Sequence, residues 1–261
     1  MRFTALSAMQ TIISRIAADK FGKVSKGPLS SWVASFSKEW EIFVYERDNT
    51  WGLDKEERKA IFLEEVGMEA SQLEEKILLD AGCGNGVLTA ALGHYSMESV
   101  GIDISDSVIG ANANKERFAG VRHHFVHFLQ GDLTRPPLRK GSFDLVYSSG
   151  VLHHTPDTRV AFSNIAPLVK QGGALYVWVY GQRHFLVRQY VALGRFLARH
   201  MSLQSLYASC RILSPIYKLL TGFLSLLRIC EFRKRSLREI TLDLFDAFSP
   251  PFNHVHTPEQ V

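Results

Sequence analysis

Short apolar runs alternate with segments of helical periodicity through the middle of the chain. The apolar runs predict strands at residues 77–80, 100–103, 124–129, 141–149 and 174–180. The segments between them predict helices that begin near Val87, Ser107 and Asp157, and Gly172-Gly173 is expected to end the last of these in the left-handed conformation. Regular alternation of strand and helix is typical of the α/β class. We therefore expect a doubly wound, mostly parallel sheet with helices on both faces.

The chain before this region predicts an N-terminal helical entry to the sheet. Residues 5–18 have apolar positions at helical spacing, and residues 19–35 are rich in Gly, Pro, Ser and Lys, which is typical of a loop or linker. An aromatic-rich helix is predicted from Phe36. Asp54 followed by Glu57 predicts a capping box at the start of another helix.

After the last predicted strand, the pattern indicates helices only, up to about residue 247. The first of these helices is predicted to have an apolar face and an opposite basic face. The apolar face holds Leu186, Tyr190, Leu193 and Leu197, and the basic face holds Arg188, Arg195 and Arg199. We therefore divide the chain into an N-terminal helix and linker (1–35), a core (36–181) and a helical cap or appendage (182–261).

Basic residues are concentrated in this appendage. Residues 181–240 contain 11 Lys or Arg against 2 acidic residues, whereas the whole chain has a formal net charge of only +4. A basic amphipathic helix can lie on an anionic membrane surface or attract an anionic substrate. The alternative, which we favour, is a solvated basic face on a cap that shapes a substrate pocket. Pro215, Lys218 and Arg228 interrupt the most apolar stretch and argue against a transmembrane span.

Composition is that of an ordinary globular chain. Hydrophobic residues make up 46% and charged residues 21% of the 261 residues, which allows one domain with a large core plus an appendage. The three cysteines have no paired spacing, so neither a disulfide framework nor a zinc knuckle is predicted. A reducing, cytoplasmic location fits this usage, with peripheral membrane contact as an addition. No secretory signal is recognised, and a mitochondrial transit peptide is a minor alternative.

A glycine-rich turn joins the first predicted strand to the helix that follows. Asp80 closes the strand. The residues of the turn are Gly82, Cys83, Gly84, Asn85 and Gly86. A strand, a glycine turn and a helix in this order let the backbone approach a ligand closely. A dinucleotide site is disfavoured because Val87 stands where its third glycine is needed, and because the Asp80 carboxylate would repel a pyrophosphate but attract a cation.

The spacing D-x-G-x-G-x-G resembles the first motif of class I S-adenosylmethionine-dependent methyltransferases, whose cofactor is a cation without phosphate. The resemblance implies a Rossmann-like fold and S-adenosyl-L-methionine as the cofactor, with its amino-acid end on the glycine turn. It also implies that Asp103 and Ile104 lie at the ribose, since Asp103 ends the next strand about 20 residues further on. Asp132 and Leu133 are implied to lie at the adenine. The alternative is that these acids merely cap helices.

A second motif follows the fourth predicted strand. The sequence S-S-G-V-L-H-H-T-P-D closely resembles the fourth motif of methyltransferases of the ubiquinone/menaquinone-biosynthesis type, the methyltransferase type 11 domain. Ligands bind outside the carboxyl ends of parallel strands, so Ser148, Ser149 and Gly150 are expected beside the methionine part of the cofactor. His153 and His154 are expected at the rim, where a methyl acceptor arrives, as candidate general bases. Alternatively, one histidine caps the next helix and the other is buried and hydrogen-bonded.

The aromatic residues before the glycine turn are a weaker signal. The F-S-K-E-W segment and the turn at Trp51 resemble the entry region of many bacterial small-molecule methyltransferases, in which the entry helices fold over the cofactor. That resemblance implies that Phe36, Trp40 and Trp51 line a lid. The alternative is that they are ordinary core aromatics.

Other histidines do not predict a metal site. His123, His124 and His127 lie on or beside the third predicted strand, with no carboxylate or Cys at ligand spacing. His254 and His256 are candidate residues of the acceptor pocket, because this region borders that pocket in the proteins that the motifs resemble. We therefore expect no bound metal.

The last residues predict the start of a helix. Thr257-Pro258-Glu259-Gln260 has a capping residue, a proline in the first turn and a glutamine at the third position, yet the sequence stops at Val261. Proteins with these motifs continue through that helix into two further strands. We therefore expect that the last strands of the sheet are missing from this sequence.

Together these features predict an S-adenosylmethionine-dependent methyltransferase that acts on a small-molecule acceptor of quinol, lipid-like or natural-product type. No nucleic-acid partner is expected. One alternative is a catalytically silent module that binds the cofactor. The other is a nucleic-acid methyltransferase, which is disfavoured because no N-P-P-Y-type tetrapeptide follows the fourth strand.

Overall fold

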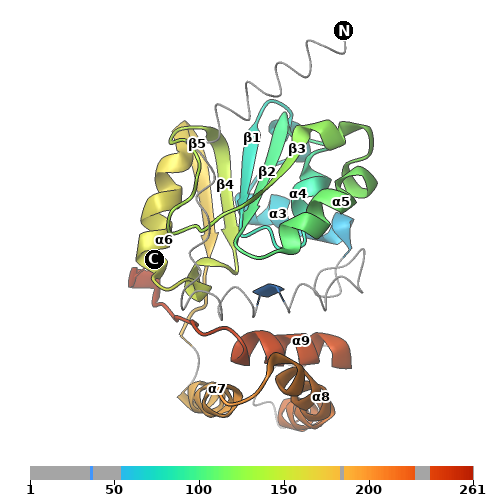
Figure 1. Ribbon diagram of the computed structural model, residues 1–261, viewed down its shortest axis with the longest axis vertical. Coiled ribbons are helices and arrows are strands. Elements are labelled where there is room, and N and C mark those ends of the chain that lie inside the picture. Colours follow the sequence, from blue (N-terminus) through green and yellow to red (C-terminus); the bar gives the residue numbers. More distant parts are fainter. Residues whose placement is uncertain (1–35, 38–53, 183–184, 227–235, 261) are drawn as a thin grey trace.

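The computed structural model describes residues 36–37, 54–182, 185–226 and 236–260 (Figure 1). In this part of the chain a five-stranded sheet has the order β3-β2-β1-β4-β5, and every pairing in it is parallel. The strands are β1 (Ile77–Ala81), β2 (Glu98–Asp103), β3 (Val126–Gln130), β4 (Phe143–Ser149) and β5 (Val169–Trp178). The predicted α/β, Rossmann-like class is confirmed.

Helices follow the strands in the alternation that the sequence predicts. The α-helices are α3 (Lys55–Val66), α4 (Val87–Leu92), α5 (Ser107–Ala119), α6 (Thr158–Ile165), α7 (Phe185–Ala198), α8 (Leu203–Leu226) and α9 (Leu237–Phe248). Short 3-10 helices are η1 (Ala70–Leu73), η2 (Gly120–Phe125), η3 (Leu152–His154), η4 (Ala166–Leu168) and η5 (Pro258–Gln260). None of the helices described is long and apolar enough to cross a bilayer.

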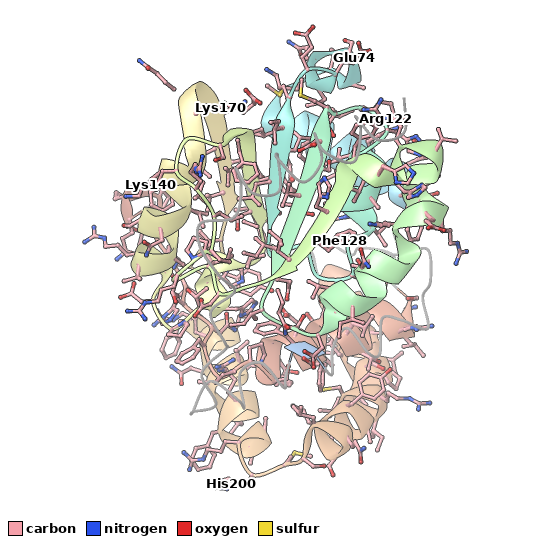
Figure 2. All side chains as sticks on the ribbon, turned by 45° about the horizontal axis from the view of Figure 1, so that its top comes forward. Glu74, Arg122, Phe128, Lys140, Lys170 and His200 are labelled. Carbon is pink, nitrogen blue, oxygen red and sulfur yellow. The ribbon has the colours of Figure 1, made fainter. Side chains whose placement is uncertain are left out.

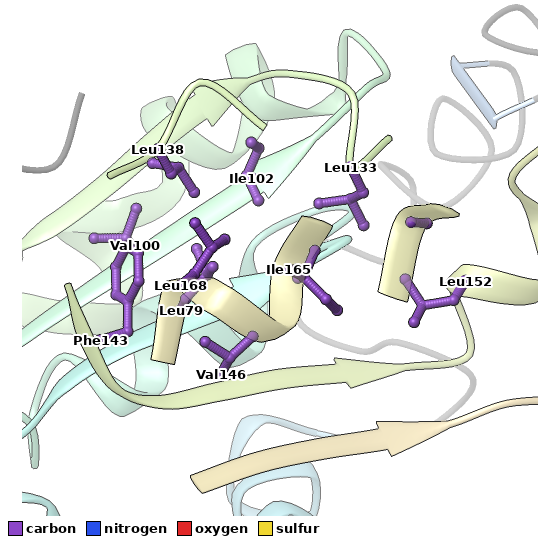
Figure 3. Close-up of a cluster of buried hydrophobic side chains, with 12 residues drawn as sticks. Leu79, Val100, Ile102, Leu133, Leu138, Phe143, Val146, Leu152, Ile165 and Leu168 are labelled. Atoms are coloured by element: carbon purple, nitrogen blue, oxygen red, sulfur yellow. The ribbon is translucent and has the colours of Figure 1, made fainter. Parts of the chain in front are cut away.

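Strand β1 is buried on both faces, as its continuous apolar run predicts. Leu79 packs with Val146 of β4 and Ile165 of α6 on one face (Figure 3). Leu78 packs on the other face with Phe62 of α3 and with α4. Burying large apolar side chains on both sides stabilises a central strand, at about 25 cal/mol for each Å² removed from water.

The start of α3 confirms the predicted capping box. The Asp54 carboxylate accepts hydrogen bonds from the backbone N–H groups of Glu56 (2.8 Å) and Glu57 (2.9 Å). The Glu57 carboxylate in turn accepts the Asp54 N–H at 2.9 Å. The helix ends at Gly67, whose φ of 64° is left-handed.

The predicted starts of β3 and β5 and the predicted end of α6 are wrong. Strand β3 begins at Val126, because the preceding residues form η2, which holds His123 and His124. Helix α6 ends at Ile165 because Pro167 cannot continue it. Gly172-Gly173 therefore does not cap a helix: it lies inside β5, where the pairing register with β4 shifts and Gly172 has a φ of 78°.

Helix α9 forms the buried centre of the appendage. It lies between the carboxyl edge of the sheet and the pair α7 and α8 (Figure 1). Phe245 of α9 is fully buried and meets the ring of Tyr207 from α8 edge-on at 5.8 Å. Gly194 of α7 lies against Phe248, where an added Cβ would be 2.4 Å from the ring.

The predicted apolar face of α7 points away from α9 and not into the core. Tyr190, Leu193 and Leu197 are exposed, and the Leu186 side chain lies outside the described residues. The side that faces α9 instead includes Gly194 and Arg195. Gly194 allows close approach to Phe248, and the Arg195 guanidinium donates to the carbonyls of Ala247 (3.2 Å) and Pro251 (2.9 Å). These contacts decide the orientation of the helix against its apolar pattern.

The predicted N-terminal helix and linker (1–35), Trp40 and Trp51 lie outside the described residues. At the other end the predicted helix start is a 3-10 turn, in which the Thr257 N–H donates to the Gln260 side chain at 2.9 Å. The expectation of two more strands concerns residues beyond this sequence and stays a prediction.

Candidate functional site

The predicted site residues lie in the loops that follow β1, β2, β3 and β4. Because these strands are parallel neighbours, their carboxyl ends share one edge of the sheet. This edge faces α9 (Figure 1). The structure therefore brings together residues that are up to 72 positions apart, from Gly82 to His154.

The glycine turn and Asp103 are joined directly. The Gly84 N–H donates to Asp103 Oδ2 at 2.9 Å, while Oδ1 accepts the Ser105 N–H at 2.9 Å and the Ser105 hydroxyl at 2.6 Å. Burial raises the pKa of the Asp103 carboxyl, although these hydrogen bonds oppose the change. The two elements predicted to hold the cofactor are thus in contact.

The turn presents its backbone because side chains cannot be accommodated there. Gly82 and Gly86 have φ values of 93° and 72°, which L side chains rarely adopt. A Cβ on Gly82 would lie 2.3 Å from Val151, and one on Gly86 would lie 2.5 Å from Phe128, which Figure 2 labels. The loop after β4 and strand β3 therefore pack directly against the turn.

The other two turn residues are Cys83 and Asn85. Cys83 is buried with its sulfur facing Gly101, and burial raises the pKa of its thiol, so it acts as a small packing residue. The Asn85 side chain accepts the Val87 N–H at 3.3 Å, which favours the start of α4.

Asp80 lies beneath the turn. Its carboxylate accepts the Thr89 hydroxyl at 2.6 Å and so ties α4 to β1. Burial raises its pKa to about 6, opposed by that hydrogen bond and by the charge of Arg58. Asp80 also lines an internal cavity of ≈ 10 Å³ with Phe62, which has room for about one water. The side chain thus points into the core, and its negative charge lies close under the turn.

The loop after β3 reaches the same edge. The Gly131 N–H donates to the Asp103 carbonyl at 2.8 Å. Asp132 is partly buried and accepts the Thr134 N–H at 2.8 Å, while Leu133 belongs to the core. Ile104, which follows Asp103, is partly buried.

The residues after β4 form the facing wall. Ser148 is buried and donates to the Ala81 carbonyl at 2.9 Å, so it fastens the end of β4 to the end of β1. Ser149 and Gly150 are partly buried, and Gly150, with a φ of 78°, donates its N–H to the Trp178 carbonyl at 3.0 Å.

The predicted open position of His153 and His154 is wrong. Both lie in η3 and are buried, at 0% and 4% exposure. Tyr180 stacks on His153 with ring centroids 3.8 Å apart, and Phe36 meets His154 at 5.7 Å. The chain from residue 252 onward also covers them, because the His254 N–H donates to the His153 carbonyl at 2.9 Å. Neither histidine caps α6: Asp157 does so, accepting the Val160 N–H at 3.0 Å.

Asp246 and Tyr180 complete this cluster, and the sequence analysis missed both. Asp246 of α9 places Oδ1 3.6 Å from His154 Nε2, and its Oδ2 accepts the Tyr180 hydroxyl at 2.7 Å. His154 Nδ1 lies 3.1 Å from the Phe252 carbonyl. One signal was present in the sequence: Asp246 follows Leu242 by four residues, so an acid occupies the apolar face of its helix.

Phe36 and Ser37 lie across the carboxyl edge. Phe36 contacts His154 after β4, while the Ser37 hydroxyl accepts the Asp106 N–H after β2 at 3.4 Å. Strand β1 and its glycine turn lie between these two points in the sheet order. These two contacts join the loops after β4 and β2, and the lid role of Phe36 stays a prediction.

The other histidines that the structure describes do not meet around a common point. The rings of His123 and His124 in η2 are tilted against each other with centroids 3.8 Å apart, and His127 lies on β3 beside Glu98. His254 and His256 bond to Thr155 and Thr158 near η3. In the part of the chain that is described, no group of three or more His, Cys, Asp or Glu residues is placed to hold a metal.

Comparison with known proteins identifies the domain. A family model described as a methyltransferase domain matches residues 79–177, which span β1 to the end of β5. The chain carries a methyltransferase domain of the S-adenosylmethionine-dependent class. The cofactor of this domain is S-adenosylmethionine. Tyr180 and Asp246 lie outside the matched residues.

The relatives match over less than half of this chain. An uncharacterized methyltransferase of Mycobacterium tuberculosis is 35% identical over 105 residues, covering 40% of this chain and 51% of the relative. A ubiquinone biosynthesis O-methyltransferase of Coxiella burnetii is 29% identical over 126 residues, covering 47% and 50%. The chain thus spans about half the length of these relatives. The crystal structure of the Bacillus subtilis YcgJ protein has a TM-score of 0.43 and 26% identity, covering 52% of this chain and 58% of that one.

The charge around the glycine turn fits the cofactor of the methyltransferase domain. No Lys or Arg occurs between Lys76 and Lys115, whereas this stretch contains four acidic residues, among them Asp80 and Asp103. Carboxylates suit a cationic sulfur and the hydroxyl donors of a ribose. The stretch offers no basic side chain of the kind that pairs with phosphate.

Proposed function

We propose that this protein transfers the methyl group of S-adenosylmethionine to the oxygen of a small aromatic acceptor. The observation that carries the proposal is the pairing of two features on one edge of the sheet. Gly84 and Asp103 form a cofactor cradle at the ends of β1 and β2, and His154 with Asp246 forms a proton-accepting pair after β4, the neighbour of β1. Acceptor and cofactor can then meet over the end of β1.

The cofactor side of this site uses backbone and carboxylates. When bound, S-adenosylmethionine supplies a methyl group on a cationic sulfur, which retains the electron pair of the broken carbon–sulfur bond as the acceptor oxygen bonds to the methyl carbon. The glycine turn holds the amino-acid end of the cofactor, together with Ser149 and Gly150. Asp103 accepts from the ribose hydroxyls, and Asp132 from the adenine amino group.

His154 accepts the proton that the acceptor loses. Its Nδ1 faces the Phe252 carbonyl, which can only accept, so Nδ1 carries the hydrogen in the neutral ring. The lone pair is then on Nε2, which can take a proton. The Asp246 carboxylate, 3.6 Å away, stabilises the imidazolium that forms. His153, stacked on Tyr180, positions the wall beside it.

Aromatic rings around the histidines favour an aromatic acceptor. Trp178 and Tyr180 meet edge-on with centroids 5.5 Å apart, and the Phe36 ring lies 5.7 Å from that of His154. Such rings offer apolar faces and edges to a phenol or quinol. A relative named as a ubiquinone biosynthesis O-methyltransferase is consistent with this class of acceptor. A silent cofactor-binding module is the competing function.

The test combines binding with turnover. We expect calorimetry to detect S-adenosylmethionine binding by the wild-type chain and a loss of at least about tenfold in affinity for Asp103→Asn, because the variant loses a charge-assisted acceptor. Asp54→Asn is the matched control, since asparagine caps α3 equally well. Incubation with isotope-labelled cofactor and a panel of phenols and quinols then measures methyl transfer.

Equal affinity of Asp103→Asn and wild type would contradict the placement of the cofactor. Binding by the wild type without methylation of any phenol or quinol would instead support the silent module.

A further inference from the structure

We propose that the outer face of α7 and α8 docks on a lipid bilayer that contains anionic lipids. The outer face is defined as the side of these two helices that points away from α9. The docking proposal goes beyond the methyl-transfer proposal, because neither helix contributes a side chain to the site described above. Three observations carry it: exposed apolar residues, their common orientation and the charge around them.

Helix α7 contributes four large apolar side chains. Phe185, Leu193, Phe196 and Leu197 are each 52–63% exposed. The opposite side of α7, with Gly194, packs on Phe248 of α9. An amphipathic helix that covers a core would have the reverse arrangement, with these side chains inside. The outer side of α7 is therefore apolar although its side chains do not pack in the core of the protein.

Helix α8 contributes a longer stripe. Ile212, Ile216, Leu219, Leu220 and Phe223 are each 53–76% exposed. They recur at intervals of three or four residues, so they follow one side of the helix for three turns. Isolated exposed leucines are ordinary, but a continuous stripe of this size marks an interaction site.

The two sets of side chains point the same way. Both helices pack on α9, and α9 separates them from the sheet (Figure 1). His200, which follows α7, marks the end of the molecule away from the sheet (Figure 2). The outer face is therefore a terminal surface of the molecule, which a planar partner can reach.

The charge around the outer face selects the partner. Residues 158–230 contain no Asp or Glu. Helices α7 and α8 carry four basic residues, and a fifth, Arg199, directly follows α7. Arg195 donates to the carbonyls of Ala247 in α9 and of Pro251 after it, which leaves Arg188, Arg199, Arg211 and Lys218 at the flanks. The Arg199 guanidinium lies 3.9 Å from the centroid of the Phe196 ring, so charge and apolar surface adjoin. Apolar residues with basic flanks are the signature of a helix lying in the interface of an anionic membrane.

The same charges disfavour two other occupants. A two-fold dimer through this face would place the basic flanks of one copy against those of the other. Residues 1–35, which lie outside the described structure, are themselves basic, with five Lys or Arg against one Asp. A bilayer with anionic lipids supplies both the hydrocarbon and the negative charge.

Vesicle binding without cofactor tests this proposal separately from methyl transfer. We expect the wild-type chain to co-sediment with vesicles of equal phosphatidylcholine and phosphatidylglycerol at low salt, and more weakly at about 1 M salt, where the Debye length is about 3 Å. Ile216→Gln with Leu219→Gln should lower the partition coefficient by roughly tenfold or more at both salt concentrations, because it removes apolar area. Arg188→Gln with Arg199→Gln should lower it at low salt only.

Val121→Gln is the matched control, because Val121 is 90% exposed but lies in η2, next to Arg122 and far from His200 (Figure 2). It should bind as the wild type does. Circular dichroism of each variant checks that it is folded. Three results would overturn the proposal: no binding of the wild type to the vesicles at either salt concentration, unchanged binding of the Ile216/Leu219 variant, or a wild-type dimer that the same variant dissociates.

Discussion

At the scale of single residues, buried ionisable groups connect the parts of the proposed site. Asp103 joins the cofactor cradle to β2, and Asp246 joins the histidines to the appendage. Each carboxylate accepts hydrogen bonds from neighbouring elements, which offsets part of the cost of removing it from water. Their substitution therefore separates cofactor binding from proton transfer.

We predict that Asp246→Asn lowers kcat by about 10–100-fold and leaves cofactor affinity and acceptor KM unchanged. The amide still accepts the Tyr180 hydroxyl but no longer stabilises a positive charge on His154. Steady-state kinetics with a phenolic acceptor measures the split. Asp243→Asn, one turn earlier in α9, is the control and should leave kcat unchanged. An equal loss of kcat in both variants would point to disruption of the helix instead.

Glu98 predicts a pH dependence of stability. It lies at the start of β2, with Oε1 3.9 Å from His127 Nε2. Burial raises the pKa of Glu98 to about 7 and lowers that of His127 to about 4. The folded protein thus keeps a proton on Glu98 that the unfolded chain loses at a pH of about 4.5. Stability from this group is present below that pH and is lost as the pH rises to 7.

Glu98→Gln removes this loss, since glutamine stays neutral. We expect the variant to exceed the wild type by about 1–3 kcal/mol in the free energy of unfolding at about pH 8, and to match it near pH 4.5. Urea unfolding at several pH values measures this difference in the free energy of unfolding. The contribution of His127 largely cancels, because both proteins contain it. Glu116→Gln, with an exposed carboxylate, should show no such trend. Parallel curves for Glu98→Gln and wild type would refute the assignment.

At the scale of elements, close backbone contacts decide how helices are oriented. Asp54 and Glu57 specify the start of α3 by local hydrogen bonds, and the prediction there is confirmed. The orientation of α7 depends instead on Gly194 and Arg195 meeting α9, some 50 residues further along the chain. The pattern of apolar positions along the chain does not predict this contact with α9.

Substitution of two helical glycines by alanine should change the stability of the protein in opposite directions. A Cβ at Gly110 in α5 would meet nothing within 4 Å, so Gly110→Ala should raise stability by about 0.5–1 kcal/mol through helix propensity. A Cβ at Gly194 would lie 2.4 Å from Phe248, which is itself buried, so Gly194→Ala should lower stability by about 1–3 kcal/mol. Chemical denaturation of both variants measures this contrast. A gain in stability for Gly194→Ala would show that α7 does not pack there.

At the scale of the whole molecule, a methyltransferase core and a helical appendage share one site. Tyr180 comes from the core and Asp246 from the appendage, and their hydrogen bond of 2.7 Å connects the two beside His154. The outer face of α7 and α8 lies on the far side of α9 from this site (Figure 1). The appendage thus has one side for the proposed acceptor site and one for the proposed membrane.

Cofactor binding should stabilise the whole chain. At a concentration of about 100 times Kd, S-adenosylmethionine should raise the free energy of unfolding by about 2.7 kcal/mol. Asp103→Asn should lose most of this increase, whereas Leu219→Gln on the outer face should retain it. Denaturation with and without cofactor measures both, and hydrogen exchange should show the largest protection in the loops after β1 and β2. An increase in Asp103→Asn equal to that of wild type would contradict the proposed cradle.

The sequence by itself determined the class of fold and the proposed place of the cofactor. Strand β1, its glycine turn and Asp103 were predictable because each depends on neighbours in the chain: an apolar run, positive φ angles and an acid at a strand end. Parallel strands then bring such ends to one edge without further information.

Only the tertiary structure decided what surrounds the acceptor. The burial of His153 and His154, the approach of Asp246 and the outward apolar sides of α7 and α8 all depend on where α9 packs. That position follows from contacts between residues far apart in the chain. A local pattern of hydrophobicity does not predict the energies of such contacts. Local sequence therefore specified the cradle, and long-range packing specified the proton acceptor and the exposed surface.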